Sequence, residues 1–351
     1  MQAIRFGVDL AKSVFQVHGV DAAEKVVVQR QLKRGQVEAF FAHQPPALIG
    51  LEACGSAHHW ARRLGALGHE VRLMPPAYVK PYVRRNKNDA RDAEACCEAV
   101  GRPTMRFVPV KSVERQCARA LMKARDLLVK QRTQLANAMR GLLYEMGVTG
   151  AKGAAGMTAL LARIEAADAA IPAALLCCLQ PLARQWRALA DEIGRLDREI
   201  VARVGQDAAA RRLTAVPGVG PLSAYAVVAA IGDGSQFGSG RDFAAWLGLT
   251  RRNHDSGGKA SLTGKISRAG DEAVRKLLVL GASSHLARVR AKPGTGPGTG
   301  PGTRPAVGSA WIRGVLARRP VKVAVVAQAA KTARILWAML RSGQDYRAPA
   351  A

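Results

Sequence analysis

The chain has 351 residues, 48% of them hydrophobic, which is enough for two or three domains of ordinary size with buried cores. Its 53 lysine and arginine residues outnumber 26 acidic residues, and the formal net charge of +27 argues against an ordinary metabolic enzyme and for a polyanionic partner, nucleic acid first. No apolar run of 18 residues and no signal peptide is recognisable, so we expect a cytoplasmic protein without a membrane span.

The positive charge is unevenly distributed along the chain. Residues 1–100 carry a net charge of +4, whereas residues 251–351 carry +15. The first hundred residues also contain the densest supply of carboxylates. We therefore expect the nucleic-acid contacts to concentrate in the C-terminal part and a different chemistry in the N-terminal part.

The cysteines predict a reducing environment. The six cysteines include two adjacent pairs and no C-x-x-C spacing, which fits neither a zinc site nor a disulfide framework. We expect these side chains to be buried and apolar.

Residues 1–108 have the pattern of alternating strands and helices. Strand patterns precede Asp9 and recur at 14–20, 25–32, 47–52 and 70–73, and helical patterns occupy 35–43, the run through Trp60 and 88–100. Three strands in succession, followed by alternation with helices, predict a mixed sheet covered by helices in an α/β domain.

Residues 109–205 are predicted to form a helical coiled-coil segment. Apolar residues recur at steps of three and four from Val113 to Met146, and again from Trp186 to Val204. An Ala-rich stretch with two prolines separates the two runs and turns the chain back. The expected product is a helical hairpin, used either for dimerisation or for packing within its own domain.

Residues 206–351 are predicted to form a mostly helical third domain. Its sequence Ala215-Val-Pro-Gly-Val-Gly-Pro221 is typical of a helix-hairpin-helix turn, in which Gly218 and Gly220 let the backbone approach a nucleic-acid phosphate. A plain turn between two helices is the alternative. Residues 293–305 form a Gly/Pro/Thr insertion of linker composition, and a last helix is expected over 323–340.

Two acidic residues stand at the ends of strands in the first domain. Asp9 ends the first strand and Glu52 ends the strand at 47–52. A carboxylate beside a buried strand face is costly unless it is paired or bound to a cation. The two positions are therefore candidates for metal ligands.

Two further acids share one face of the predicted helix at 88–100. Asp89 and Asp92 are three residues apart and project in the same direction. Oxygen-only ligands select hard cations such as Mg²⁺ or Mn²⁺, and two such ions support phosphoryl transfer. The alternatives are a favourable helix N-terminus for Asp89 and an ion pair with Lys87 or Arg91 for Asp92.

Ser256 is the candidate nucleophile of the C-terminal domain. It precedes two glycines, which permit a tight exposed loop, and a loop residue without chemistry is the alternative. A serine hydroxyl among cations can attack a phosphodiester. The neighbouring His254 is either a general base, a phosphate contact or a loop residue. The basic residues expected to bind nucleic acid around this serine are Arg251, Arg252, Lys259, Lys265 and Arg268.

Segments along nearly the whole chain resemble the DEDD transposases of bacterial insertion sequences, of the insertion-sequence-one-ten type, which are related to the pilin-gene-inverting recombinases. The matching segments are Gly7–Lys12, Gly50–Gly55, Asn86–Asp92, Trp246–Arg252, Asp255–Lys259, Ser267–Gly270 and 333–340. His254 and Asp255, just before the serine, and the insertion after residue 292 depart from the pattern of that family.

The resemblance implies different catalytic roles for the first and the third domain. The first domain would have the ribonuclease-H-like fold of the RuvC resolvase, with Asp9, Glu52, Asp89 and Asp92 as the metal-binding tetrad. Ser256 would be the catalytic serine and form a phosphoserine link to a DNA end. The resemblance also implies a bridge RNA that guides target choice, and dimers that associate further.

The leading hypothesis from the sequence is a Mg²⁺-dependent DNA transposase or site-specific recombinase that acts on double-stranded DNA. The first alternative is a metal-dependent junction nuclease that hydrolyses DNA without a serine intermediate. The second is a non-catalytic nucleic-acid-binding protein on a degenerate nuclease scaffold. The role of Ser256 separates the first two, and the need for Asp9 in cleavage separates both enzymes from the third.

Overall fold

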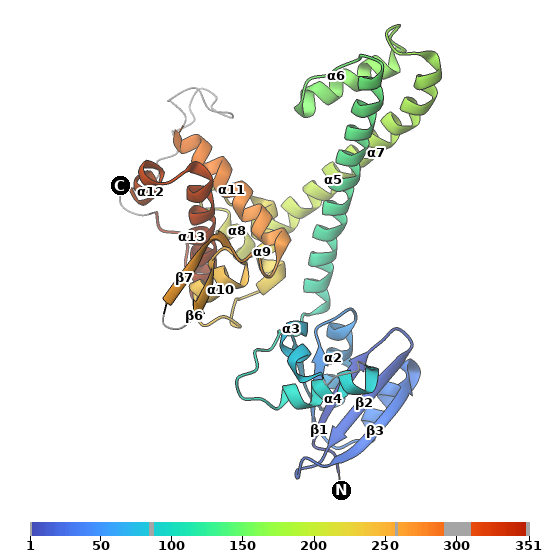
Figure 1. Cartoon of the computed structure of the whole chain (residues 1–351), viewed down its shortest axis with the longest axis vertical. Coiled ribbons are helices and arrows are strands. Elements are labelled where there is room, and N and C mark those ends of the chain that lie inside the picture. Colours follow the sequence, from blue (N-terminus) through green and yellow to red (C-terminus); the bar gives the residue numbers. More distant parts are fainter. Residues whose placement is uncertain (1, 84–87, 257–258, 291–309, 349–351) are drawn as a thin grey trace. The chain divides into compact units, whose positions relative to one another are not determined.

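The computed structural model describes residues 2–83, 88–256, 259–290 and 310–348, and of residues 253–264 it describes the backbone alone. The chain divides into two compact units, Met1–Val113 and Glu114–Ala351 (Figure 1). Each unit is described by itself below.

The N-terminal unit is built on a five-stranded mixed sheet. Its strands are β1 (Arg5–Leu10), β2 (Val14–Val20), β3 (Val26–Lys33), β4 (Leu48–Glu52) and β5 (Glu70–Met74). Their order is β3-β2-β1-β4-β5, with β2 antiparallel to its neighbours β1 and β3, and with β4 and β5 parallel to β1. The mixed sheet predicted from the alternating pattern is confirmed.

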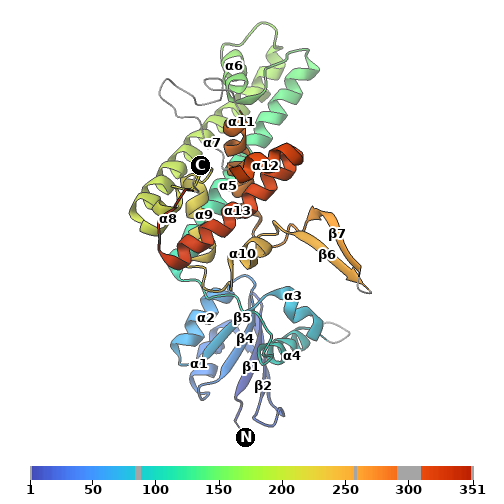
Figure 2. The ribbon, with the colours of Figure 1, turned by 90° about the vertical axis from the view of Figure 1, so that its left-hand side faces the viewer.

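Helices cover both faces of this sheet (Figure 2). The helical elements are η1 (Arg34–Gln36), α1 (Val37–Ala42), α2 (Ala57–Ala66), α3 (Pro76–Val79), η2 (Lys80–Tyr82) and α4 (Asp89–Val100). On one face, Phe6 and Val8 of β1 pack into a core with Phe41 of α1 and Trp60 and Leu64 of α2. The opposite face of β1 and β4 is covered by α4.

Two glycines allow α4 to lie directly on the sheet. A Cβ atom at Gly7 would stand 2.1 Å from the carbonyl oxygen of Ala93, and one at Gly50 would stand 2.7 Å from that of Cys96. Real Cβ atoms do not approach backbone so closely, so any other residue at either position pushes the helix away. The helix is therefore held directly against β1 and β4.

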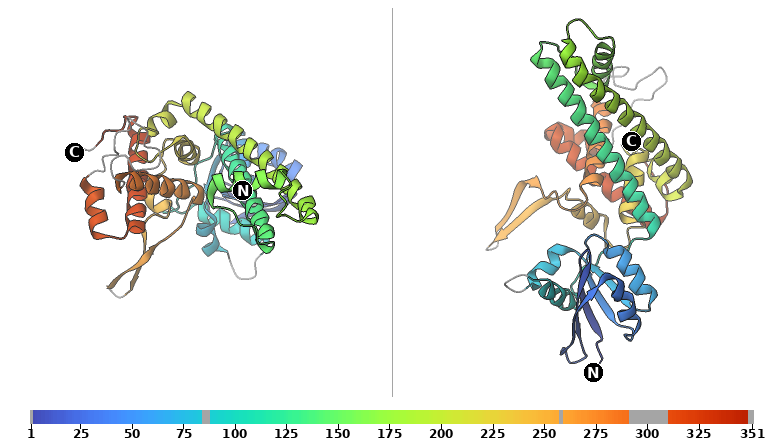
Figure 3. Two further views of the ribbon diagram at one scale, coloured as in Figure 1. Left: turned by 90° about the horizontal axis from the view of Figure 1, so that it is seen from above. Right: turned by 90° about the vertical axis from the view of Figure 1, so that its right-hand side faces the viewer.

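The second unit begins with a long helical hairpin (Figure 3). Its helices are α5 (Val113–Glu145), α6 (Gly153–Glu165) and α7 (Ala173–Gln206). A core at the tip joins Met139 and Leu143 of α5 to residues of α6 and α7. Pro172 precedes α7 as expected for a helix start, but Pro181 lies inside the helix and does not turn the chain.

The prediction of which residues form the inward-facing apolar seam is right for α7 and wrong for α5. Ile193, Ile200 and Val204 of the α7 seam are buried, whereas Val113 and Met146, which open and close the α5 seam, are about half exposed. The inward face of α5 uses Ala136, Met139 and Leu143 instead. Small and apolar residues occur on several faces of α5, so a spacing of three and four describes more than one stripe.

The rest of the second unit is a helical domain that carries one antiparallel β-ribbon. Its elements are α8 (Ala208–Leu213), α9 (Pro221–Ile231), α10 (Gly240–Trp246), β6 (Arg251–Ser256), β7 (Lys259–Ile266), α11 (Glu272–Arg290), α12 (Ala310–Arg318) and α13 (Val321–Ser342). The core forms where α13 packs on α10 and α11. The insertion at 293–305 lies outside the described residues.

Helix α13 is the one described helix whose length and apolar composition suit a membrane span. Its residues Ala324, Ala329 and Leu336 are fully buried in the domain core. This burial is what the central helix of a folded domain shows, so composition alone does not make α13 a membrane segment.

The expectation that the cysteines are buried is wrong for four of the six. Cys96 and Cys97 of α4 are buried, but the others are exposed: Cys54, Cys117, Cys177 and Cys178. The last two lie in the first turns of α7, whose inward face is formed by Leu179 and Ala183. A cysteine is small enough to be tolerated on either side of a helix.

Replacing Gly7 with alanine is expected to lower the free energy of unfolding by about 1–3 kcal/mol, because the new Cβ meets backbone atoms of α4. Urea denaturation measures the change. The matched control is Gly65→Ala, since a Cβ at Gly65 in α2 meets nothing within 4 Å and alanine favours a helix. Equal destabilisation by both variants would contradict the close packing of α4.

Candidate functional site

The first two candidate ligands occupy neighbouring strand ends. In the parallel pairing of β1 and β4, Val8 is the register partner of Leu51, so Asp9 and Glu52 are the next residue on each strand. Side chains alternate along a strand. Asp9 therefore shares the face of Gly7, and Glu52 the face of Gly50, and this is the face that α4 covers.

The other two candidates are placed by the start of α4. The side-chain oxygen of Asn88 accepts a hydrogen bond from the backbone N–H of Arg91 at 2.9 Å, which caps the helix and makes Asp89 its first residue. Asp89 and Asp92 thus lie in the first turn, where negative charge also favours the helix dipole. Asp89 is exposed and Asp92 half-buried.

The structure brings three of the four candidate carboxylates together. One ligand atom from each of Asp9, Asp89 and Asp92 lies within 4.8 Å of the other two. Among the described residues, Glu52 is not part of this group. The sequence analysis correctly predicted that the three aspartates lie close together. They meet because Gly7 and Gly50 let α4 pack directly on β1 and β4.

Two cysteines show that Glu52 lies in the same electrostatic environment. Burial raises the pKa of the Cys96 thiol, and the negative charges of Glu52 and Asp9 raise it further. Burial also raises the pKa of the Cys54 thiol, again with added contributions from Glu52 and Asp9. Both thiols therefore lie close enough to Asp9 and Glu52 for the negative charge of the two carboxylates to raise their pKa.

The chemistry of this cluster fits a divalent cation. The three aspartates offer only oxygen ligands, the set that Mg²⁺, Mn²⁺ and Ca²⁺ prefer. Carboxylates this close repel one another, and a bound cation removes that repulsion. These residues are thus the part of the N-terminal unit best suited to hold a metal.

The candidate nucleophile stands at the far end of the β-ribbon from the domain core. Ser256 is the last residue of β6 and pairs in register with Lys259, the first residue of β7. The two glycines between them, and the side chains of Ser256, Lys259 and His254, lie outside what the structure describes. The ribbon itself projects from the helices of its unit (Figure 2).

The base of the ribbon is basic and exposed. The side chains of Arg251, Arg252, Lys265 and Arg268 are all exposed. Arg252 also donates a hydrogen bond to the backbone oxygen of Ser267 at 3.2 Å, which ties the two edges of the ribbon together. The charge is therefore accessible to a polyanion.

An ion pair that the sequence analysis did not identify anchors the segment after the ribbon. Asp271 accepts a hydrogen bond from the backbone N–H of Val274 at 3.0 Å, which caps α11. Its other oxygen forms a 2.8 Å ion pair with Arg119 of α5, and the Asp271 side chain is only 8% exposed. Asp271 could have been identified from the sequence as an acid just before a helical run. No feature of the sequence around Arg119 marks it as the partner of Asp271.

Backbone contacts fix the same segment on its other side. Arg275 donates hydrogen bonds to the backbone oxygens of Leu247 at 3.0 Å and Ala269 at 2.6 Å. Gly270 has a φ of +67°, and a Cβ there would stand 1.8 Å from the oxygen of Trp246. The ribbon therefore emerges from a rigid base between α10 and α11.

The helix-hairpin-helix candidates lie at the start of α9. Gly218 has a φ of +84°, which suits glycine, and Gly220 is the residue that precedes the helix. Pro221 occupies the first helical position, where a missing N–H costs nothing. A turn joins α8 to α9, as both the helix-hairpin-helix prediction and its plain-turn alternative require, and its backbone runs close to Gly281 of α11.

Two family models match the chain. Residues 210–295 match the model described as the transposase IS116/IS110/IS902 family, and residues 6–147 match a transposase model labelled for DEDD transposases of IS110. The two matches contain all four candidate carboxylates and Ser256.

Several known proteins are similar to the chain over almost its whole length. It is 49% identical to a probable family 20 transposase of Pseudomonas aeruginosa over 99% of both chains. It is 47% identical to a putative transposase, y4pF/y4sB, of Sinorhizobium fredii over 99% of this chain and 86% of that protein. It is 40% identical to the transposase for insertion sequence element IS1111A of Coxiella burnetii, covering 97% of this chain and 90% of that one.

Replacing Asp89 with asparagine is expected to weaken Mn²⁺ binding at least about tenfold, because one charged ligand of the aspartate cluster is lost. Isothermal titration of the full chain with Mn²⁺ measures the affinity. Glu98→Gln is the matched control, because Glu98 lies on the same helix but forms an ion pair with Arg102. Unchanged affinity in the Asp89→Asn variant would contradict a metal site at this cluster.

Proposed function

The chain belongs to the IS116/IS110/IS902 family of transposases, and we propose that it moves an insertion sequence by Mg²⁺-dependent cleavage and serine-mediated strand exchange. Membership of this family makes it an enzyme that acts on DNA and implies a divalent metal. The observation that carries the proposal is the convergence of Asp9, Asp89 and Asp92 within 4.8 Å.

The N-terminal unit is proposed to be a RuvC-like domain with the ribonuclease-H fold. Three antiparallel strands followed by two parallel ones, in the order β3-β2-β1-β4-β5, support this assignment. The carboxylates at the ends of β1 and β4 and at the start of α4 support it further. We expect Asp9, Glu52, Asp89 and Asp92 to form the complete metal-binding set.

The carboxylates and the metal would have separate tasks in the reaction. When bound, Mg²⁺ ions polarise the scissile phosphate and stabilise the charge on the attacking and leaving oxygens. The chain supplies ligands of fixed position, since Asp9 is held by the sheet and Asp89 and Asp92 by the capped first turn of α4. Preorganised charge of this kind lowers the barrier without reorganisation during the reaction.

Ser256 is proposed to be the nucleophile. Its hydroxyl oxygen forms a bond to the phosphorus and loses its proton, while the bond from phosphorus to the leaving deoxyribose oxygen breaks and that oxygen is protonated. The free DNA end of a second strand then attacks the phosphoserine and releases the serine. One phosphodiester is exchanged for another, so no high-energy cofactor is consumed.

The exposed arginines and lysine at the base of the ribbon support this role. Arg251, Arg252, Lys265 and Arg268 would neutralise phosphates on either side of the serine. Gly218 and Gly220 would offer backbone N–H groups to a further phosphate of double-stranded DNA. We therefore place both nucleic-acid contacts in the second unit.

A bridge RNA and self-association complete the proposal. The strongly basic C-terminal part suits an RNA guide, and loss of target choice after ribonuclease treatment would test that role. Two exposed apolar residues, Leu142 of α5 (39% exposed) and Met146 just after it (49% exposed), support a dimer through the helical hairpin. Sedimentation of Leu142→Glu tests this surface, because an unchanged oligomer in this variant would exclude it.

Replacing Ser256 with alanine is expected to abolish both strand exchange and the covalent protein–DNA adduct, because no other group supplies the attacking oxygen. The adduct is measured by denaturing electrophoresis of labelled DNA after reaction with Mg²⁺. Ser261→Ala, on the facing strand of the same ribbon, is the matched control and should retain both. Cleavage that persists without any adduct in the wild type would favour the metal-dependent junction nuclease instead.

A further inference from the structure

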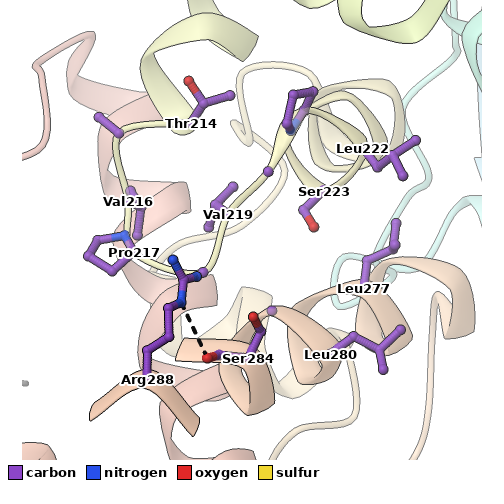
Figure 4. Close-up of a pocket in the computed structure, with 15 residues that line it drawn as sticks. Thr214, Val216, Pro217, Val219, Leu222, Ser223, Leu277, Leu280, Ser284 and Arg288 are labelled. Carbon is purple, nitrogen blue, oxygen red and sulfur yellow. Dashed lines mark hydrogen bonds between the residues drawn. The ribbon is translucent and has the colours of Figure 1, made fainter. Parts of the chain in front are cut away.

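A pocket of about 590 Å³ lies between the turn before α9 and the helix α11 (Figure 4). One wall is the continuous stretch Thr214–Ser223, and the other is a face of α11. The residues of α11 that line it are Leu277, Leu280, Gly281, Ser284 and Arg288. The pocket thus joins the helix-hairpin-helix turn to a second helix that is distant in the sequence.

The two walls are held together by backbone contact. A Cβ at Gly218 would stand 2.6 Å from the carbonyl oxygen of Gly281, and a Cβ at Gly281 would stand 1.9 Å from that of Gly218. Glycine at both positions therefore lets the turn rest on α11. The shape of the pocket is set by backbone and does not depend on flexible side chains.

Ser223 is a buried polar residue without a partner. It is only 7% exposed, and among the described residues nothing forms a hydrogen bond with its side chain. Figure 4 shows its hydroxyl directed into the space above α11. The hydroxyl opens into the pocket, so a ligand bound there would accept its hydrogen bond.

Two further groups at the pocket can donate hydrogen bonds. Ser223 is the third residue of α9, whose first N–H groups have no acceptor within the helix and carry its positive dipole end. Arg288 lies at the rim, where its Nε donates to the backbone oxygen of Ser284 at 3.5 Å. The guanidinium charge is thereby held beside the opening (Figure 4).

The composition of the lining favours a phosphodiester over other ligands. Among the described residues, no carboxylate and no side-chain amide lines the pocket, so a base edge would find few of the acceptors that read its sequence. An anion would find a hydroxyl, a guanidinium and a helix N-terminus. The apolar side chains of Val216, Leu277 and Leu280 would contact the sugars on either side of it.

We propose that this pocket binds one backbone phosphate of duplex DNA, with the hydroxyl of Ser223 and the guanidinium of Arg288 as its side-chain ligands. The inference rests on the proposed function, since it assumes that the second unit holds DNA. It extends the contact from the turn glycines to α11. Because every contact is to phosphate or sugar, the pocket fixes the position of the duplex and does not select its sequence.

Fluorescence anisotropy of the full chain with labelled duplexes tests the pocket, in the absence of divalent metal so that no cleavage occurs. Arg288→Gln is expected to weaken binding about tenfold and to reduce the salt-dependence slope by about 0.9, equally for two unrelated sequences. Ser223→Ala is expected to weaken binding about fivefold without changing the slope, because it removes no charge. The controls are Arg290→Gln and Ser283→Ala, which lie on α11 and do not line the pocket.

Wild-type affinity for duplex DNA in both pocket variants would overturn the inference. So would variants that lose affinity for a matched single-stranded RNA and keep it for DNA. Equal losses in the pocket variants and their controls would show a diffuse charge effect and also exclude the pocket. None of these outcomes bears on the proposed roles of the metal cluster and of Ser256. A wild-type chain that binds no DNA would instead contradict the proposed function itself.

Discussion

The close approach of α4 to the sheet is the constraint on which the N-terminal site depends. Helix and strands come within backbone contact only because Gly7 and Gly50 carry no side chain. The same contact carries the first turn of α4 to the end of β1, where Asp89 and Asp92 meet Asp9. The mutual repulsion of these carboxylates is therefore imposed by the packing of the domain, and a divalent cation relieves it.

A similar use of glycine builds the part of the second unit that we propose binds nucleic acid. Gly218 and Gly281 bring the turn before α9 onto α11, and Gly270 fixes the base of the basic ribbon against α10. Backbone contacts of this kind add to the side-chain core of each unit and hold charged residues on a rigid support. The uneven charge of the chain matches the proposed roles, with carboxylates where metal would be held and cations where phosphates would bind.

The local sequence pattern was enough to predict the sheet and the acids Asp9 and Glu52 at its strand ends. It also predicted that Asp89 and Asp92 share one face of α4. Each of these features depends on residues close in sequence. The inward face of α5 was not predictable, since apolar and small residues occupy several of its faces and only the partner helices select one. The Arg119–Asp271 ion pair and the pocket that Ser223 lines depend on elements distant in the sequence. No local signal marks either of them.

Anomalous diffraction from crystals grown with Mn²⁺ tests the central claim most directly, because it locates the metal without reference to activity. The account predicts an anomalous peak bounded by Asp9, Asp89 and Asp92, with a carboxylate oxygen of Glu52 completing the ligand set. Manganese bound elsewhere in the chain, with the three aspartates unliganded, would contradict the assignment of this cluster as the catalytic metal site.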